Sequence, residues 1–333
     1  MRIKLDVLQT LLFRCVRQLQ KDTCSASNWL GHRVFHIDGS SFSMPDTPSL
    51  QAHFGQHTGQ KPGCGFPTAH LMVMLHAGTG MITKILASPW RTHEMSKTVE
   101  IHPELKANDL LVADRGFCSY SHLALLFQRG VHGLLRIHQR TIVDFTPGRA
   151  HVKPGPVKGG EIKGKPRSRW IKQLGTTDQI VEWLKPVNKP SWMNCEQFAA
   201  LPASIVVREL RYTIHEKGFR PKVVTLVTTL LDVERYPLED LAEQYRQRWE
   251  IETNLGHLKT TMKMDVLKCK TVDGVLRELN VFALVYNMVR QVMLAAACRQ
   301  EVDVRRISFI DALRWLQLSR PGDELPKLVV ISH

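Results

Sequence analysis

The chain has 333 residues, of which 43% are hydrophobic and 23% are charged. This composition is that of a globular protein and excludes wholesale disorder, collagen and low-complexity fibres. Lysine and arginine number 45 against 31 aspartate and glutamate residues, which gives a net charge of +14. Such a surplus favours a polyanionic partner, nucleic acid first, with an anionic membrane surface and an acidic protein as alternatives.

The seven cysteines are scattered and none forms a Cys-x-x-Cys pair, which favours a reducing cytoplasm over a disulfide framework or a zinc cage. Two arginines interrupt the apolar stripe of residues 1–20, so this segment predicts an amphipathic helix and not a signal peptide. The apolar stretch 279–298 contains two asparagines and Arg290. We therefore expect a core helix there and no membrane span.

Two apolar strands are expected to end at an acid. Residues 34–39 close on Asp38 and Gly39, and residues 110–113 close on Asp114. For a single aspartate, the simplest interpretation is a residue that starts a turn or caps a helix. Two aspartates in the same context favour a functional site, because sites are built where strands end.

The other expected elements surround these two strands. We expect a hairpin of 70–75 and 81–87, a helix from Glu94, a helix over 121–129, strands over 133–137 and 223–231, a long helix over 238–264, and a helix over 273–300. Together they predict an α/β fold with a mixed sheet flanked by helices.

Residues 139–221 differ in character and predict an insertion or a second small domain. Proline and glycine cluster there, and between Lys153 and Lys172 seven basic residues accompany one acid. A charge run of this kind is often a solvated loop, but Trp170 within it offers a face for base stacking. The candidate DNA-binding residues of this run are Lys163, Lys165, Arg167 and Arg169.

The expected helix after residue 238 carries a polar stripe. At about 100° per residue, four side chains share one face: Tyr245, Arg248, Glu252 and Lys259. Glu243 and Glu250 fall on the opposite side, so this geometry selects Glu252 as the acid of the stripe. The alternative is an ordinary amphipathic helix in which Arg248 and Glu252 form a salt bridge one turn apart.

Three carboxylates from two strands and one helix suit a pair of hard divalent cations. Such cations prefer oxygen ligands and retain waters and substrate phosphate oxygens. Two cations roughly 3.5 to 4 Å apart stabilise the attacking and leaving oxygens of a phosphoryl displacement. The basic residues near the third acid would then hold the nucleic acid backbone.

These residues resemble the IS-four family of bacterial insertion-sequence transposases, which are DDE (Asp, Asp, Glu) recombinases. The spacing of Tyr245, Arg248, Glu252 and Lys259 satisfies the family signature Tyr-x2-Arg-x3-Glu-x6-Lys. Residues 38–48 resemble the first catalytic block of the family, and residues 113–117 resemble the second. The resemblance covers about residues 30–270.

The resemblance implies an RNase H-like fold with a mostly β insertion between the second catalytic aspartate and the glutamate. The implied organisation is a short N-terminal helical segment (1–30), core (31–138), basic insertion (139–221), core (222–270) and C-terminal helical region (271–333). Asp38, Asp114 and Glu252 are then the catalytic residues and the ligands of two Mg²⁺ ions, which Mn²⁺ can replace.

The resemblance also implies how DNA is held. Tyr245, Arg248 and Lys259 would contact phosphates at the transposon end, and Arg115 joins the DNA-binding candidates. Two departures from the family stand out. Only 37 residues precede Asp38, so we expect a shortened region for recognising the terminal repeats. The strand beginning at Lys222 lacks the tryptophan that relatives place there.

The implied activity is that of a DNA transposase. It cleaves DNA at insertion-sequence ends in a metal-dependent reaction and transfers the strand into target DNA. The expected partners are the terminal inverted repeats and target DNA, bound by a homodimer in the bacterial cytoplasm at the nucleoid. The alternatives are a truncated or domesticated DNA-binding derivative without transposition activity and a related RNase H-like nuclease.

Overall fold

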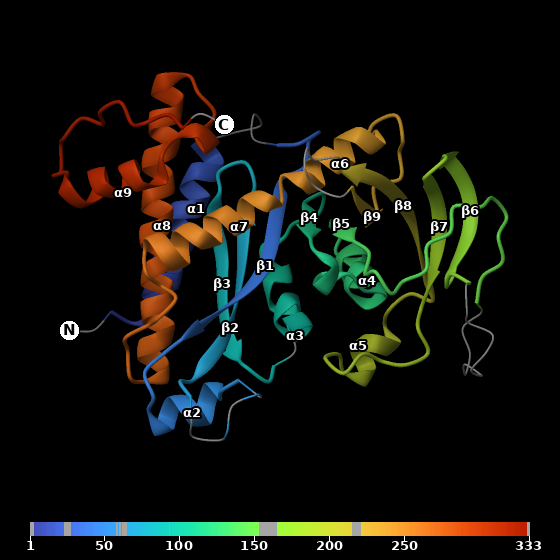
Figure 1. Ribbon diagram of the computed structural model, residues 1–333, viewed down its shortest axis with the longest axis horizontal. Coiled ribbons are helices and arrows are strands. Elements are labelled where there is room, and N and C mark those ends of the chain that lie inside the picture. The colour runs from blue at the N-terminus through green and yellow to red at the C-terminus, as the bar shows by residue number, and fades with distance from the viewer. Residues whose placement is uncertain are drawn as a thin grey trace. The chain divides into compact units, whose positions relative to one another are not determined.

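The computed structural model describes residues 3–22, 28–57, 59, 61, 65–92, 94–152, 165–214 and 221–331. They form a mixed α/β protein (Figure 1) whose chain divides into two compact units. The first unit comprises Met1–Val34, Asp38–Lys97 and Glu250–His333, and the second comprises Phe35–Ile37 and Thr98–Trp249. The chain therefore passes between the units twice within its first strand, again after Lys97 and again after Trp249.

The sheet of the first unit has the strand order β3-β2-β1. Its strands are β1 (Val34–Ser43), β2 (Thr68–His76) and β3 (Met81–Pro89). β2 and β3 pair antiparallel, which confirms the hairpin that the turn residues predict. Gly80 closes this turn with a φ of 65°, and a Cβ there would collide with the Arg290 guanidinium, so glycine is required.

Helices cover the sheet of the first unit. They are α1 (Leu5–Asp22), α2 (Pro48–Phe54), α3 (Glu94–Thr98), α7 (Trp249–Gly256), α8 (Val272–Gln300) and α9 (Phe309–Leu318). A π-helical turn, η4 (His257–Thr261), follows α7, and a 3-10 turn, η5 (Val304–Arg306), precedes α9. Apolar residues of the sheet and of α1, α2, α7, α8 and α9 form one buried core.

α8 is the central helix of this core. Among the described residues, α8 alone is long and apolar enough to cross a membrane, with a mean hydropathy of 1.5 over its most apolar window. Half of that window is buried inside the protein. The Tyr286 hydroxyl donates to the Gly80 carbonyl, and Arg290 donates to the Thr79 carbonyl. This packing is that of a core helix, as the sequence predicts.

The second unit contains a longer run of strands. Their order is β4-β5-β9-β8-β7-β6, with Phe35–Ile37 of β1 beside β4. The strands are β4 (Leu110–Ala113), β5 (His132–Arg136), β6 (Ser168–Gly175), β7 (Asp178–Leu184), β8 (Ser204–Ile214) and β9 (Lys222–Thr228). β4 and β5 are parallel, and every later pair is antiparallel.

The helices of the second unit are short. They are α4 (Tyr120–Gln128), α5 (Cys195–Ala199) and α6 (Leu238–Arg246), with 3-10 turns η2 (Val99–Glu104) and η3 (Arg115–Phe117). The expected insertion contributes β6, β7, α5 and β8 to this unit, and β8 pairs with β9. The boundaries of an insertion domain at 139–221 stay a prediction.

The first strand is longer than the sequence predicts. β1 continues to Ser43, so Asp38 lies inside the strand and not at its carboxyl end. Gly39 has no positive φ, and the residues after it keep the extended backbone. Ser43 then forms a parallel bridge with Val266, a partner far along the chain. The expectation that this strand ends at Asp38 and Gly39 was therefore wrong.

The long helix expected over 238–264 is also wrong, because three elements occupy that segment. α6 ends at Arg246, α7 begins at Trp249, and η4 follows from His257. The Arg248 N–H bonds to the Tyr245 carbonyl, three residues earlier, which tightens the turn between α6 and α7. A single rotation of about 100° per residue therefore does not apply across the segment.

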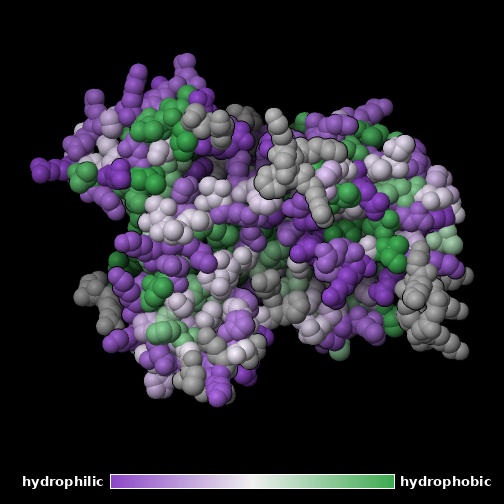
Figure 2. Space-filling view, in the orientation of Figure 1, coloured by the Kyte–Doolittle hydropathy of each residue, from purple (hydrophilic) through white to green (hydrophobic). Residues whose placement is uncertain are grey.

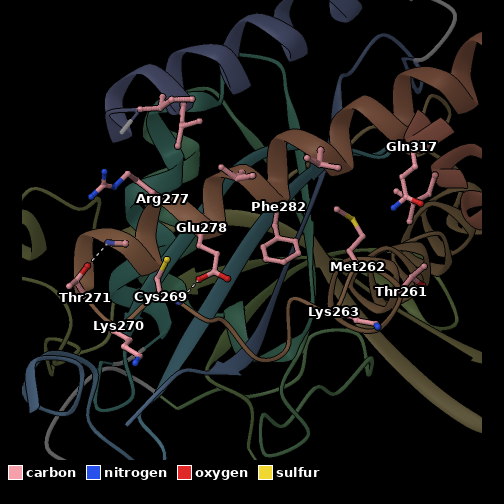
Figure 3. Close-up of a pocket in the computed structure, with 16 residues that line it drawn as sticks. Thr261, Met262, Lys263, Cys269, Lys270, Thr271, Arg277, Glu278, Phe282 and Gln317 are labelled. Carbon is pink, nitrogen blue, oxygen red and sulfur yellow. Dashed lines mark hydrogen bonds between the residues drawn. The ribbon is translucent and has the colours of Figure 1, made fainter. Parts of the chain in front are cut away.

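The surface has both hydrophilic and apolar areas. On the visible face hydrophilic side chains predominate (Figure 2), as the charge composition requires. An open groove of about 1040 Å³ in the first unit (Figure 3) is lined by polar and apolar residues of α8 and α9 and by residues 261–263 and 269–271. Its one carboxylate, Glu278, accepts the N–H groups of Lys268 and Cys269. That carboxylate therefore holds a loop in place.

Candidate active site

Asp38 and Lys259 are brought to the same strand of the first unit. Asp38 is partly exposed on β1, and its Oδ1 accepts the Gly39 N–H at 2.8 Å. Lys259 lies in the π-helical turn, and its Nζ donates to Ser40 Oγ at 2.9 Å. Residues two apart on a strand point to the same face, so the Lys259 ammonium lies on the Asp38 face of β1.

The chain after this turn fixes the end of β1. The Ser43 N–H donates to the Asp265 carbonyl at 3.0 Å, and the Leu267 N–H donates back to Ser43 at 3.0 Å. Glu278 of α8 then holds the next two backbone N–H groups, of Lys268 and Cys269. The first unit thus sets the register between the strand that carries Asp38 and the chain that leaves α7.

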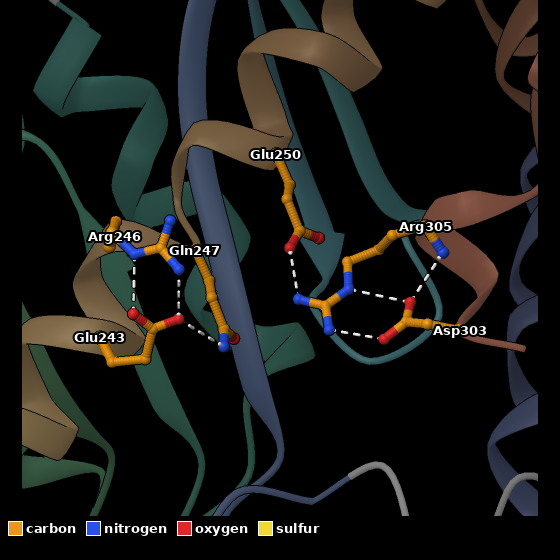
Figure 4. A network of polar contacts seen from close by, with 6 residues as sticks. All are labelled: Glu243, Arg246, Gln247, Glu250, Asp303 and Arg305. Atoms are coloured by element: carbon orange, nitrogen blue, oxygen red, sulfur yellow. Dashed lines mark hydrogen bonds and ion pairs between the residues drawn. The ribbon is translucent and has the colours of Figure 1, made fainter. Parts of the chain in front are cut away.

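Glu252 lies on α7, where it is an exposed acid. Its neighbour Glu250 instead accepts from Arg305 Nη1 at 3.1 Å, and Arg305 is also paired with Asp303 (Figure 4). Burial raises the pKa of Glu250, an effect that the Arg305 guanidinium opposes. Glu250 therefore serves to connect α7 to η5.

The other glutamate near this segment, Glu243, belongs to the second unit. Both of its carboxylate oxygens accept from Arg246, at 2.7 and 2.8 Å (Figure 4). Glu243 and Glu250 are thus both engaged by arginines on their own units. The choice of Glu252 among the three acids stays a prediction, and the single long helix that suggested it is broken.

Asp114 follows β4 in the second unit, as the sequence predicts. Tyr245 donates its hydroxyl to Asp114 Oδ1 at 3.0 Å, and Arg136 Nη1 lies 3.8 Å from the same oxygen. Partial burial acts to raise the pKa of Asp114, but the Arg115 N–H, Arg248, Tyr245 and Arg136 together hold it below its usual value. This carboxylate is ionised and lies in the field of two arginines, Arg248 and Arg136.

Tyr245 and Arg248 both interact with Asp114, whereas the resemblance implies DNA phosphates as their partners. Both side chains are buried, with exposed fractions of 4% and 5%. The Arg248 guanidinium lies 5.7 Å from the Tyr245 ring centre, a cation–π contact. Burial raises the pKa of Tyr245 further above its ordinary value, and Asp114 adds to that shift, so the hydroxyl stays protonated and donates.

The remaining basic candidates differ in what they contact. Arg115 is exposed and donates to Gln139 at 2.9 Å, and Lys165 and Arg167 are exposed. Arg169 is 57% exposed but forms an ion pair with Glu182 of the neighbouring strand. Lys163 lies outside the described residues.

Two residues of this region were missed by the sequence reasoning. Arg136 ends β5 beside Asp114, and the expected strand at 133–137 is the signal that could have found it. Trp249 is 50% exposed at the start of α7, and the Lys222 ammonium lies 5.2 Å from its ring centre. An exposed tryptophan beside a cation is a surface on which a base can stack.

The predicted convergence of three carboxylates stays a prediction. The structure assembles Asp114 with Tyr245, Arg248 and Arg136 in one unit, and it brings Lys259 to the Asp38 strand in the other. Among the described residues, no three His, Cys, Asp or Glu side chains form a group that could hold a metal ion. The carboxylates themselves are the oxygen ligands that Mg²⁺ prefers.

The class of protein follows from comparison with known families. The family described as Transposase DDE domain matches residues 29–288, so the chain belongs to this family. The chain is also 25% identical to the transposase InsG of insertion sequence element IS4 from Escherichia coli (strain K12). That similarity covers 86% of this chain and 58% of InsG. The resemblance that the sequence motifs suggested is thereby confirmed.

A solved structure gives a more distant match. The piggyBac transposase synaptic complex with hairpin DNA is 12% identical, with a TM-score of 0.44. The match covers 88% of this chain and 55% of that one. The chain thus spans less than two thirds of the length of both proteins.

Proposed function

We propose that this protein is a DNA transposase that cleaves insertion-sequence ends and joins the cut strand to target DNA. The observation that carries the proposal is the family match over residues 29–288, a range within which Asp38, Asp114 and Glu252 lie. The positions of these acids support it: Asp38 lies on the first strand, Asp114 follows the fourth strand, and Glu252 lies on a later helix. The charge of +14 suits a DNA partner.

We propose an RNase H-like core as the fold that brings these residues together. The strand order β3-β2-β1 in the first unit supports it, as does the placement of Phe35–Ile37, β4 and β5 side by side in the second. The strands β6, β7 and β8, which come between Asp114 and Glu252, are the proposed insertion. A mostly β insertion at this place is what the resemblance implies.

DDE transposases depend on divalent metal ions, and we propose Mg²⁺ with Asp38, Asp114 and Glu252 as its protein ligands. All three groups are carboxylates, and Asp38 and Asp114 are partly exposed while Glu252 is exposed. Bound ions would stabilise the attacking and leaving oxygens of the phosphate under attack. The Tyr245 hydroxyl donates to one oxygen of Asp114 and so orients the carboxylate.

The proposed DNA contacts are distributed over both units. Lys259 is placed beside the Asp38 strand, where its ammonium can balance phosphate charge. Arg115, Lys165 and Arg167 are exposed cations suited to the DNA backbone. We further propose a homodimer on DNA, since two transposon ends must be cut together. A bacterial cytoplasmic location suits such a DNA substrate.

The test is nicking of supercoiled plasmid with Mg²⁺ or Mn²⁺. The variants Asp38→Asn, Asp114→Asn and Glu252→Gln should each lose on the order of 10² to 10³ or more in rate, because a neutral amide does not replace a carboxylate ligand. Glu250→Gln is the matched control, since that acid is engaged by Arg305. It should keep the rate within about tenfold.

Three outcomes would contradict parts of this proposal. DNA binding without any metal-dependent nicking by the unsubstituted chain would favour a DNA-binding derivative. Nicking that survives Glu252→Gln would contradict the assignment of the third acid. Nicking without any strand transfer, when transposon ends are supplied, would favour a related nuclease.

A further inference from the structure

Arg136 is held at the edge of the sheet that also carries Asp114. β4 and β5 are parallel, and their last paired residues are Ala113 and Leu135. Asp114 and Arg136 come one residue later on each strand, at the same edge. Arg136 also pairs with Leu226 of β9. Its backbone is thus fixed by a strand, which presents the guanidinium beside the Asp114 carboxylate at 3.8 Å.

The contact between Arg136 and Asp114 differs from the buried ion pairs that stabilise a fold. The side chains are 22% and 31% exposed, and solvent screens such pairs. Arg208 in the same unit provides the contrast. Its guanidinium is fully buried and donates through Nε, at 2.8 Å, and through Nη2, at 2.5 Å, to the two carboxylate oxygens of Asp178. Arg136 instead makes a single contact with Asp114, at 3.8 Å from Nη1 to Oδ1.

The Arg136 guanidinium has donors to spare. A guanidinium offers five N–H donors in a planar fork. Within the part of the chain that the structure describes, no hydrogen bond from this guanidinium is present, and its ion pair is with Asp114. Asp114 Oδ1 already accepts the Tyr245 hydroxyl. The fork therefore matches a group with several acceptor oxygens, and a DNA phosphate is such a group.

We propose that Arg136 is a phosphate-positioning residue, and that its guanidinium exchanges Asp114 for a backbone phosphate of DNA when a divalent cation binds the carboxylate. The proposal rests on the proposed function, because the phosphate is that of the DNA held near Asp114. The physical reason is competition. A carboxylate neutralised by a cation attracts the guanidinium less, and the phosphate offers it two oxygens.

This exchange makes two predictions of opposite sign for Arg136→Met. Removal of the positive charge should tighten the binding of a divalent cation to the DNA-free protein, by about two- to fivefold for a partly exposed pair. The same change should weaken DNA binding and lower the salt slope by about 0.9, the value for one phosphate contact. Misfolding would weaken both, so it cannot imitate this result.

The experiment uses the full chain with two probes. Mn²⁺ alone is titrated against the protein and the free ion is followed by electron paramagnetic resonance. A fluorescent DNA duplex is then titrated over a range of salt, with Ca²⁺ as a non-reactive hard cation and again in chelator. Arg129→Met, at the exposed end of α4, is the control for loss of one positive charge. It should leave the Mn²⁺ affinity unchanged.

Arg136→Lys separates charge from shape. It should bind Mn²⁺ as the unsubstituted chain does, because the charge is kept, but it should bind DNA in Ca²⁺ more weakly, because the fork is lost. The inference is overturned if Arg136→Met binds Mn²⁺ no more tightly than Arg129→Met, or if its salt slope in Ca²⁺ is unchanged. Absence of nicking by the unsubstituted chain would count against the proposed function alone, since neither titration measures cleavage.

Discussion

At the scale of single residues, two buried histidines hold the turn that follows Asp114. His122 Nδ1 lies 2.7 Å from the Phe117 carbonyl, so this nitrogen carries the proton and donates. His122 Nε2 then accepts from His102 Nε2 at 3.0 Å. Burial lowers the pKa of His102 to about 3 and that of His122 to about 4, against an ordinary value of 6.5. Both rings are therefore neutral when the chain is folded.

These two pKa values predict an acid-sensitive fold. Between about pH 6.5 and pH 4 the unfolded chain binds protons that the folded chain does not. The free energy of unfolding therefore has its full value above this window and decreases as the pH falls through it. At about pH 5 each of the two histidines should lower the free energy of unfolding by on the order of 2 kcal/mol relative to pH 7. Urea unfolding at about pH 5 and pH 7 measures the loss.

The variant that tests this origin is His122→Gln. It should reduce the difference in stability between the two pH values, because one titrating group is removed. His138→Gln is the control, since that ring is only partly buried and accepts from the Arg140 N–H at 3.1 Å. An undiminished pH dependence in His122→Gln would show that other groups cause the acid sensitivity.

At the scale of elements, α8 supplies hydrogen-bond partners to β3, an edge strand of the sheet. β3 ends the strand order, so one side of it lacks a neighbouring strand. Asn287 takes that place, because its side chain accepts the Ile82 N–H at 2.8 Å and donates to the Ile82 carbonyl at 2.8 Å. The buried edge is satisfied by one amide, which fixes how the helix lies on the hairpin.

Asn287→Leu should therefore lower the stability of the protein. Two buried backbone groups would lose their partners, at a cost of about 2–4 kcal/mol. Asn280→Leu is the matched control on the same helix. The Asn280 amide donates to the Leu276 carbonyl of its own helix at 2.8 Å, so its loss should cost about 1 kcal/mol or less. Equal losses in chemical denaturation would contradict the role given to Asn287.

At the scale of the whole molecule, the positive charge is the dominant property. For the proposed DNA substrate, a net charge of +14 favours association with any duplex, and the exposed basic residues are the proposed contacts. The structure separates cations that contact protein from those that face solvent. Arg277, for example, is ion-paired with Asp273, whereas Lys165 and Arg167 are exposed. Net charge alone does not distinguish these two groups.

Binding to random duplex DNA should therefore weaken linearly on a plot of log affinity against log salt, with about 0.9 in slope for each phosphate contact. The double variant Lys165→Gln with Arg167→Gln should reduce the magnitude of this slope by up to the value for about two phosphate contacts. Arg277→Gln should leave it unchanged, because that guanidinium is paired with Asp273. A fluorescence anisotropy titration at several salt concentrations measures all three, and equal slopes would contradict a role for Lys165 and Arg167.

The sequence by itself determined the elements whose signals are local. The hairpin of β2 and β3, the strand before Asp114 and the helix α8 follow from turn residues, apolar runs and helical periodicity, and all three are present. The signature spacing around Glu252 identified the family, because it needs only positions along the chain. Such features depend on neighbours within a few residues, so one sequence is enough to find them.

Tertiary structure decided what depends on distant partners. β1 extends past Gly39 because Ser43 pairs with the chain near Val266, and the expected long helix breaks at Arg248, whose side chain is buried beside Tyr245. Arg136 came to Asp114 because β4 and β5 are neighbours and parallel. None of these contacts leaves a periodic trace in the sequence, since each joins segments whose separation is set by the fold.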